Sequence, residues 1–237
     1  MKKIIISIIL MLNVSYAQLT FDRTRVIFDH SESSSQSVIV SNTNRQSPYL
    51  AQAWIEDEAG NKVTGPLVAL PILQRMNPGQ DKQIKISIVG DSSALATDRE
   101  TLLYLNMLGV PPKPDASVNQ INLVIQSQLK LFYRPKGLPR YSSTGWVEEM
   151  VVKQTRDGLN LQNPTAYHIV IYAISSGGKS NIIEKNVTLK PFSTENVAIK
   201  IRGNTPKIYY VNDYGAAGAL TFNCSSQDCV LKENQIR

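Results

Sequence analysis

The sequence predicts an all-β protein that consists of two immunoglobulin-like β-sandwiches. Short segments with period-two alternation or with runs of β-branched residues recur along the whole chain, as expected for strands. Clusters of Gly, Pro, Asn, Asp and Ser separate these segments. No stretch shows a sustained helical stripe, apart from a turn expected near Ser92–Asp98. Many short strands with regular turn signals are typical of sandwiches, and two sets of about seven strands match two such domains.

The expected strands of the first half end in a long segment, and those of the second half are shorter. In the first half they are Leu19–Phe28, Ser37–Ser41, Leu50–Ile55, Gln83–Val89, Leu102–Leu108 and Ile121–Tyr133. In the second half they are Trp146–Lys153, His168–Ile174, Ile182–Leu189, Asn196–Ile201, Ile208–Val211, Leu220–Asn223 and Val230–Lys232.

A proline-rich segment separates the two sets of strands. Pro135, Gly137 and Pro139 follow directly after the long strand. Proline restricts helix and ladder hydrogen bonding, so Pro135–Tyr141 is expected to be a stiff, bent linker. We therefore expect an N-terminal domain at residues 18–137 and a C-terminal domain at residues 138–237.

The first residues have the pattern of a secretory signal peptide. Lys2 and Lys3 precede the apolar run Ile4–Leu12, and Ser15 and Ala17 place small residues before a cleavage site. A membrane anchor is the alternative, but a span needs about 20 apolar residues and this run is shorter. We expect residues 1–17 to be removed and the rest to be exported without membrane insertion.

Composition and motifs exclude several functional classes. A chain with 42% hydrophobic and 19% charged residues is not of the disordered type. The net charge of +6 permits an acidic partner but does not require nucleic acid, and we expect none. Neither a nucleotide-binding loop nor a hydrolase or zinc-protease motif is present, so we expect no enzyme, no catalytic residue, no metal and no cofactor. His30 and His168 are interpreted as structural or surface residues.

Cys224 and Cys229 are the only cysteines, in the segment Cys-Ser-Ser-Gln-Asp-Cys. Export permits disulfides, and this spacing suits a bridge that closes a tight hairpin. A catalytic redox pair more often has two intervening residues and lies near a helix N-terminus. We therefore predict a structural disulfide.

The long strand combines an apolar alternation with unusual length. Ile121, Leu123 and Ile125 alternate with Gln120, Asn122 and Gln126, and Leu129 and Leu131 continue the apolar series. An ordinary buried strand explains this alternation. The alternative is an edge strand whose apolar face is lent to a partner, since an exposed edge of this kind would otherwise favour aggregation.

Arg25 lies inside the first apolar strand, in Asp22-Arg23-Thr24-Arg25. Such an arginine either faces solvent or points at an anion, because its guanidinium matches a carboxylate in a two-bonded fork. The sequence around it leaves both interpretations open.

Taken in order, several segments resemble the PapD-like family of periplasmic pilus chaperones across essentially all of the mature chain. They are Asp22–Phe28, Pro48–Glu56, Gln74-Arg75 with Pro78-Gly79, Asp98–Glu100, Pro111-Pro112, Lys130–Pro135, Asn163–Thr165, Asn212–Gly215 and the Cys224–Cys229 spacing. Each short segment alone is weak, whereas the ordered set is specific. The segment between Val110 and Gln120 is short and resembles the short-loop branch of the family.

The resemblance implies two immunoglobulin-like domains in a boomerang arrangement and a chaperone that works in the periplasm. The cleft cations of the family fall on Arg25 and Lys130, which would anchor the C-terminal carboxylate of a pilus subunit. Ile121, Leu123 and Ile125 would complete the subunit's fold by donor-strand complementation, a form of β-augmentation. The chaperone would then deliver the subunit to an outer-membrane usher.

The resemblance also implies an interdomain ion-pair network formed by Glu100, Arg134 and Asp213. A network of this kind is a plausible means of fixing domain orientation. Where relatives often have two consecutive prolines, this chain has Pro71-Ile72, which leaves the isomer of the preceding peptide bond open.

Three alternatives stay open at this point. A two-domain adhesin or structural surface protein is the second interpretation, and an exported hydrolase is a distant third. A third open point is whether the free chaperone forms a homodimer that caps its exposed edge strand. Lys130 also has the opposite parity to Ile121, Leu123 and Ile125, so a bulge, a strong twist or a cleft beyond the strand's edge must relate them.

Overall fold

The computed structural model describes residues 19–113, 123–142, 144–175 and 182–236. The expected signal peptide at residues 1–17 and the predicted donor residue Ile121 lie outside these ranges. Strands dominate the described chain, and its single helix is α1 (Gly145–Glu148). No helix among the described residues has the length and apolar character needed to cross a membrane. The all-β prediction is therefore confirmed. The turn expected near Ser92–Asp98 is present, with the Leu95 N–H bonded to the Ser92 carbonyl oxygen at 3.0 Å, and the short helix α1 forms elsewhere.

The first domain is a sandwich of two sheets around one core. Its strands are β1 (Leu19–Phe21), β2 (Arg25–Asp29), β3 (Ser35–Asn42), β4 (Tyr49–Glu56), β5 (Lys62–Val63), β6 (Leu67–Leu70), β7 (Leu73–Met76), β8 (Asp81–Ile88), β9 (Thr101–Val110) and β10 (Ile125–Arg134). One sheet has the order β1-β3-β8-β6, and the other has the order β2-β10-β9-β4-β5 with β7 beside β4. Alternate residues of each strand face the core, as in β4, where Tyr49, Ala51 and Ala53 are buried.

The expected first strand, Leu19–Phe28, is two strands in different sheets. β1 pairs with β3, whereas β2 pairs in parallel with β10. Asp22 lies at the break, and its carboxylate accepts a hydrogen bond from the backbone N–H of Ile39 at 3.1 Å. The Ile39 N–H is thus bonded to a side chain in place of a backbone carbonyl of the ladder, and at this point the chain leaves one sheet and enters the other. The switch brings Arg25 beside β10.

The second domain is one sheet that curls around its own core. Its strands are β11 (Val151–Gln154), β12 (Gly158–Asn163), β13 (Ile169–Ser175), β14 (Ile182–Leu189), β15 (Ser193–Ala198), β16 (Lys207–Val211), β17 (Ala217–Ser225) and β18 (Asp228–Ile236). The strand order is β14-β13-β16-β17-β18-β11-β12-β15. Because only residues 190–192 join β14 to β15, the two ends of this order must lie close together, which closes the sandwich.

The strand expected at Trp146–Lys153 is only partly correct. Residues Gly145–Glu148 form α1, and the strand β11 begins at Val151. Trp146 is buried and its indole N–H donates to the carbonyl oxygen of His168 at 3.2 Å. Burial in the core of the second domain, rather than strand alternation, explains the apolar character of this segment.

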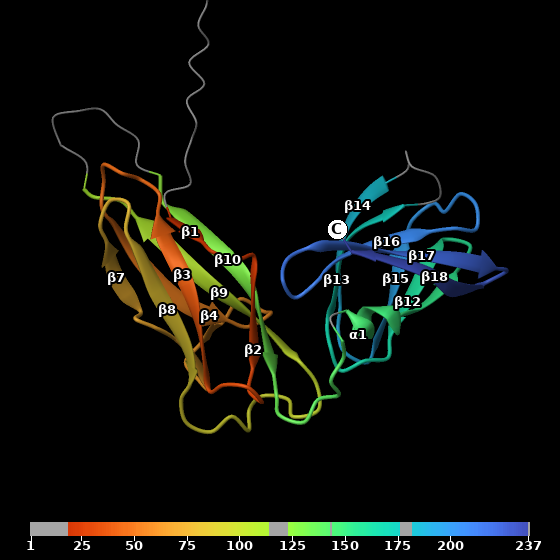
Figure 1. The fold of residues 1–237 in the computed structure, drawn as a ribbon, viewed down its shortest axis with the longest axis horizontal. Coiled ribbons are helices and arrows are strands. Elements are labelled where there is room, and N and C mark those ends of the chain that lie inside the picture. Colours follow the sequence, from red (N-terminus) through yellow and green to blue (C-terminus); the bar gives the residue numbers. More distant parts are fainter. Residues whose placement is uncertain (1–18, 114–122, 143, 176–181, 237) are drawn as a thin grey trace, which may run out of the picture.

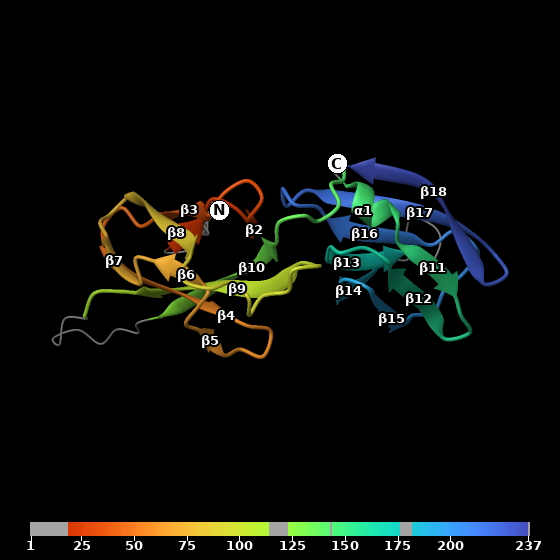
Figure 2. The ribbon, with the colours of Figure 1, turned by 90° about the horizontal axis from the view of Figure 1, so that it is seen from below.

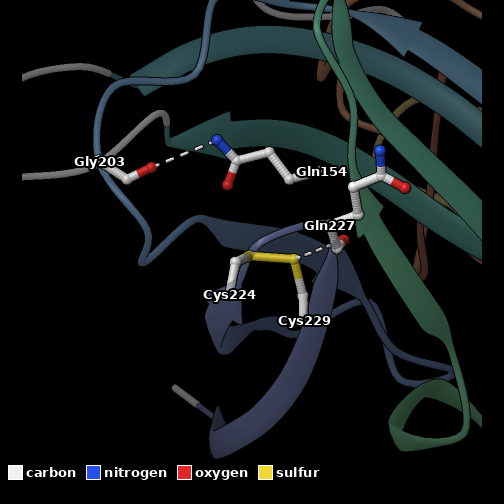
Figure 3. Close-up of a disulfide and its surroundings, with 5 residues drawn as sticks. All are labelled: Gln154, Gly203, Cys224, Gln227 and Cys229. Atoms are coloured by element: carbon white, nitrogen blue, oxygen red, sulfur yellow. Dashed lines mark hydrogen bonds between the residues drawn. A yellow bond between two sulfur atoms is a disulfide. The ribbon is translucent and has the colours of Figure 1, made fainter.

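The disulfide lies at the end of the β17–β18 hairpin (Figure 3). Cys224 and Cys229 are cross-strand partners in the ladder. The backbone N–H of Gln154 donates to the carbonyl oxygen of Gln227 in the hairpin turn at 2.7 Å, and the Gln154 side chain bonds to the carbonyl of Gly203 at 3.4 Å. The bridge therefore closes the hairpin where β11 joins the sheet, as the predicted structural disulfide requires.

The two sandwiches meet at an angle, and the chain passes once between them after β10 (Figure 1). Seen from below, they lie end to end, with α1 at the start of the second domain (Figure 2). The peptide bonds before Pro66 and Pro71 are both cis, which answers the question left open by the Pro71-Ile72 departure.

Candidate functional site

Arg25 and Lys130 are direct neighbours on adjacent parallel strands. The register of β2 and β10 places their Cα atoms opposite each other. The Arg25 Nη1 donates to the carbonyl oxygen of Val211 in the second domain at 3.2 Å, while its Nε is buried without a hydrogen-bond partner. Neither cation forms an ion pair with any carboxylate of the described residues. The pair is therefore a positively charged site with unused donor capacity.

Burial shapes the electrostatics of this pair. Desolvation lowers the pKa of Arg25, and Asp213 partly opposes that shift. Desolvation also lowers the pKa of Lys130, and the neighbouring Arg25 charge adds to the effect. Both cations lose hydration through burial, and they repel each other. A bound anion would offset both costs, so the pair is suited to bind one.

The edge of β10 is open directly before this pair. From Ile125 to Tyr133 the strand pairs with β9, but its other side pairs with β2 only from Lys130 onward. No described strand covers that side between Ile125 and Leu129. A strand added there would lie in line with β2, and if it ran parallel to β10 its C-terminus would reach Arg25 and Lys130.

One apolar series changes from buried to exposed toward the start of β10, which begins at Ile125, so Leu123 of the expected strand Ile121–Tyr133 lies just before it. Leu129, Leu131 and Tyr133 belong to the core of the first domain. Leu123 is 64% exposed and Ile125 is 42% exposed, although both continue the same alternation. Large exposed apolar residues beside an unpaired strand edge are typical of a surface that pairs with another chain.

Lys130 and the apolar residues of the alternating series face opposite sides of β10, as their sequence positions predict. The pairing of β10 with β9 has no register shift between Ile125 and Tyr133, so no bulge lies in this part of the strand. The even face carries Lys130 and Arg134, and the odd face carries Ile125. An added strand would thus offer its terminal carboxylate to one face and receive apolar side chains from the other.

Arg134 joins the two domains through a pair of carboxylates. Its Nε donates to Glu100 Oε1 at 2.7 Å, and its Nη1 and Nη2 donate to the two oxygens of Asp213 at 2.8 and 2.9 Å. Burial alone would lower the pKa of Arg134, but the bonds to Asp213 and Glu100 raise it overall. Glu100 and Arg134 belong to the first domain and Asp213 to the second, so the three predicted residues lie together at the domain boundary.

His168 completes this network from the second domain. The backbone N–H of His168 donates to Glu100 Oε2 at 2.7 Å, and its Nδ1 lies 3.0 Å from the same oxygen. The imidazole is buried and packs 5.5 Å from the Phe132 ring. The apolar strand around His168 indicates a buried residue, but nothing in the sequence relates it to Glu100.

A short turn of the second domain holds Asp213 and follows directly after Val211, the last residue of β16, whose carbonyl oxygen binds Arg25. The Asn212 side chain accepts hydrogen bonds from the backbone N–H groups of Tyr214 and Ala216 at 3.0 and 2.9 Å. Gly215 adopts a φ of 82°, and a Cβ there would lie 2.5 Å from Thr24 Oγ1 of the first domain. The turn therefore needs glycine both for its backbone conformation and for close domain contact.

A cavity of about 620 Å³ lies between the domains beside these residues. Its lining includes Arg25 and Arg134 from the first domain and Trp146, Asp213 and Tyr214 from the second. Arg25, though not Lys130, is thus among the residues that line this interdomain space.

Comparison with known proteins identifies the family. Residues 18–139 match the family described as pili and flagellar-assembly chaperone, PapD N-terminal domain, and residues 145–222 match the pili assembly chaperone PapD, C-terminal domain. The chain is 36% identical over 241 residues to the chaperone protein PapD of Escherichia coli, and the match covers 99% of each chain.

Two solved structures have the same fold. The periplasmic chaperone SfaE is 25% identical with a TM-score of 0.69, covering 92% of this chain and 98% of that one. The SafB chaperone in complex with the SafA pilin of Salmonella enterica gives a TM-score of 0.74 at 21% identity, covering 94% and 97%. The matches to both domain models and the identity to PapD show that the chain belongs to the PapD family of pilus-assembly chaperones, which is not an enzyme family.

Proposed function

We propose that this chain acts in the periplasm, where it binds a pilus subunit through β10 and passes it to an outer-membrane usher. Leu123 and Ile125, with Ile121 outside the described residues, are the proposed donor residues that fill an apolar groove of the subunit. Arg25 and Lys130 are the proposed anchor for the subunit's C-terminal carboxylate. The main support for this proposal is that the open edge of β10 ends at Arg25 and Lys130, two cations without an ion pair to any described carboxylate.

The charge of the anchor sets the direction of the added strand. A parallel strand presents its C-terminal carboxylate to Arg25 and Lys130, whereas an antiparallel strand would present an amino group or an internal peptide. Charge-assisted bonds to a carboxylate favour the parallel arrangement and fix its register. Backbone hydrogen bonds along Ile125–Leu129 supply affinity that does not depend on the subunit's sequence.

The Glu100–Arg134–Asp213 network is the proposed means of holding the two domains in the orientation that forms the anchor. Asp213 lies two residues after Val211, whose carbonyl receives the Arg25 hydrogen bond. Fixing Asp213 therefore also fixes one contact of Arg25. No nucleotide is needed in this scheme, because exchange of the chaperone strand for a better-packed subunit strand can drive release.

Co-purification of subunits from the periplasm tests the anchor. We expect Arg25→Ala and Lys130→Ala each to lose most of the subunit that the wild type retains. Arg23→Ala is the matched control, because Arg23 lies two residues away and pairs with Asp22 at the surface. Full subunit recovery with both anchor variants would contradict the proposal.

A second experiment tests the donor strand. Leu123→Glu should abolish subunit recovery while the chaperone keeps its unfolding midpoint, because Leu123 has no core beneath it. Val230→Glu, at a similarly exposed apolar position of β18, is the control and should retain the subunit. An unfolded Leu123→Glu protein would instead favour a core strand, and a wild type that binds no subunit would favour an adhesin.

The same edge also offers a pairing site to a second copy of the chain. Sedimentation of the free protein distinguishes the two states, since a dimer that caps β10 should dissociate in the Leu123→Glu variant. A dimer that persists in this variant would use another surface.

A further inference from the structure

A buried asparagine binds the solvent-facing side of the donor strand. Asn106 lies on β9 and its residue is 0% exposed. Its Oδ1 accepts hydrogen bonds from Gln126 Nε2 at 2.9 Å and from Gln128 Nε2 at 3.0 Å. Both glutamines lie on β10, one on each side of Ser127, within the segment whose other edge is unpaired.

These bonds involve only the even face of β10. Gln126 and Gln128 alternate with Ile125, so the apolar odd face stays free while the opposite face is tied to β9. The odd residues before Leu129 have little core beneath them, as the exposure of Ile125 shows. The order of this segment therefore depends on the β9 ladder and on the two side-chain bonds to Asn106.

The chemistry of Asn106 suits this task. A buried amide oxygen requires hydrogen-bond donors, and two glutamine amides satisfy it without introducing a charge. Among the described residues, the Nδ2 at the other end of the side chain makes only a long contact, 3.5 Å from the carbonyl oxygen of Tyr104. The amide is thus committed chiefly to β10.

We infer that Asn106 is a positioning residue that holds β10 extended and in register before a subunit arrives. This inference rests on the proposed donor-strand function. A strand that is ordered in advance spares the complex the conformational entropy of ordering it, which increases affinity without any new contact to the partner. Asn106 itself is fully buried in the free chain, so its expected effect on affinity acts through β10.

The first readout needs no subunit. Replacing Asn106 with leucine keeps the number and branching of the side-chain heavy atoms and leaves both glutamines free to bond to water. We expect Asn106→Leu to speed hydrogen exchange at the backbone amides of residues 125–129 by about tenfold, the equivalent of one net hydrogen bond. Exchange in β13 of the second domain should not change. Gln52→Leu is the matched control, because Gln52 lies on neighbouring β4 and its side-chain amide has no hydrogen bond to any residue that the structure describes.

The second readout is affinity for the subunit recovered with the wild-type chain. We expect Asn106→Leu to weaken binding by about tenfold. The surface variant Gln126→Leu/Gln128→Leu should have a similar effect, and combining it with Asn106→Leu should add little, because all three residues act through the same two bonds.

Distinct outcomes separate this inference from the proposed function. Exchange and binding within twofold of the wild type for Asn106→Leu would overturn the inference while leaving the donor strand intact. The inference would also be overturned if Gln126→Leu/Gln128→Leu reduced affinity for the subunit by the same factor in the presence of Asn106 and in the Asn106→Leu variant. The glutamines would then act on the subunit directly. A wild type that binds no subunit would refute the proposed function, whereas the exchange measurement would still test the positioning of β10.

Discussion

Replacing Arg134 with methionine tests whether the interdomain network holds the two domains together. Methionine keeps the aliphatic bulk of the side chain and removes the guanidinium. Glu100 would then keep its charge and the bonds from His168 but lose its cationic partner. The perturbation therefore leaves a buried carboxylate without charge compensation.

The size of the effect follows from the exposure of the three groups. The Glu100 side chain is 1% exposed and that of Arg134 is 12% exposed, so solvent screens this pair weakly. Removing one partner of a buried pair costs about 3–5 kcal/mol. Asp213 is 22% exposed and regains water, so it adds less. Changing Glu100 to glutamine in the same protein removes the orphaned charge and should reduce the loss to about 1–2 kcal/mol.

Urea unfolding followed by tryptophan fluorescence measures these differences. Trp54 reports on the first domain and Trp146 on the second, close to Arg134. Small-angle scattering of the folded variants should show a broader distribution of domain orientations for Arg134→Met. Lys153→Met is the control, because its pair with Asp228 is long, at 3.7 Å, and exposed.

Two results would refute this reasoning. A loss below about 1 kcal/mol for Arg134→Met would mean that the buried pair does not stabilise the interface. A double variant with Glu100→Gln that is no more stable than Arg134→Met alone would mean that the loss does not come from an uncompensated charge.

Three further changes test separate parts of the structure. Gly215→Ala should cost about 1–3 kcal/mol by urea unfolding, because its φ of 82° and the 2.5 Å approach of a neighbouring side chain both disfavour a Cβ; an unchanged midpoint would contradict the turn geometry. The hydrogen bond from Arg23 lowers the pKa of Asp22, so the ionised carboxylate stabilises the fold above its unfolded pKa, and this contribution is lost as pH falls below about 4. In Asp22→Asn the thermal midpoint should therefore fall less steeply with decreasing pH in this range, and a fall as steep as in the wild type would contradict the role of Asp22. Replacing Cys224 and Cys229 together with serine should cost about 2 kcal/mol, since the closed loop is short; loss of subunit binding by a folded variant would show a role beyond stability.

Local patterns in the sequence account for most of the strands. The alternation in β4 and β8 predicts which residues face the core, because side-chain period and burial agree there. The segment around Trp146 misleads, since an apolar run of this length fits either a strand or a short buried helix. The first apolar segment also misleads, because its residues suit a single strand and only the Asp22 bond to β3 divides it between two sheets.

The chain by itself determined the all-β class, the two-domain organisation, the cysteine hairpin and the apolar alternation of the long strand, because these depend on neighbours close in sequence. Only the tertiary structure decided that Arg25 lies opposite Lys130, that β10 is open from Ile125 to Leu129, and that His168 binds Glu100. These relations depend on which strands pair and on how the two domains meet. Such pairing joins residues far apart in the chain, and no local pattern encodes it.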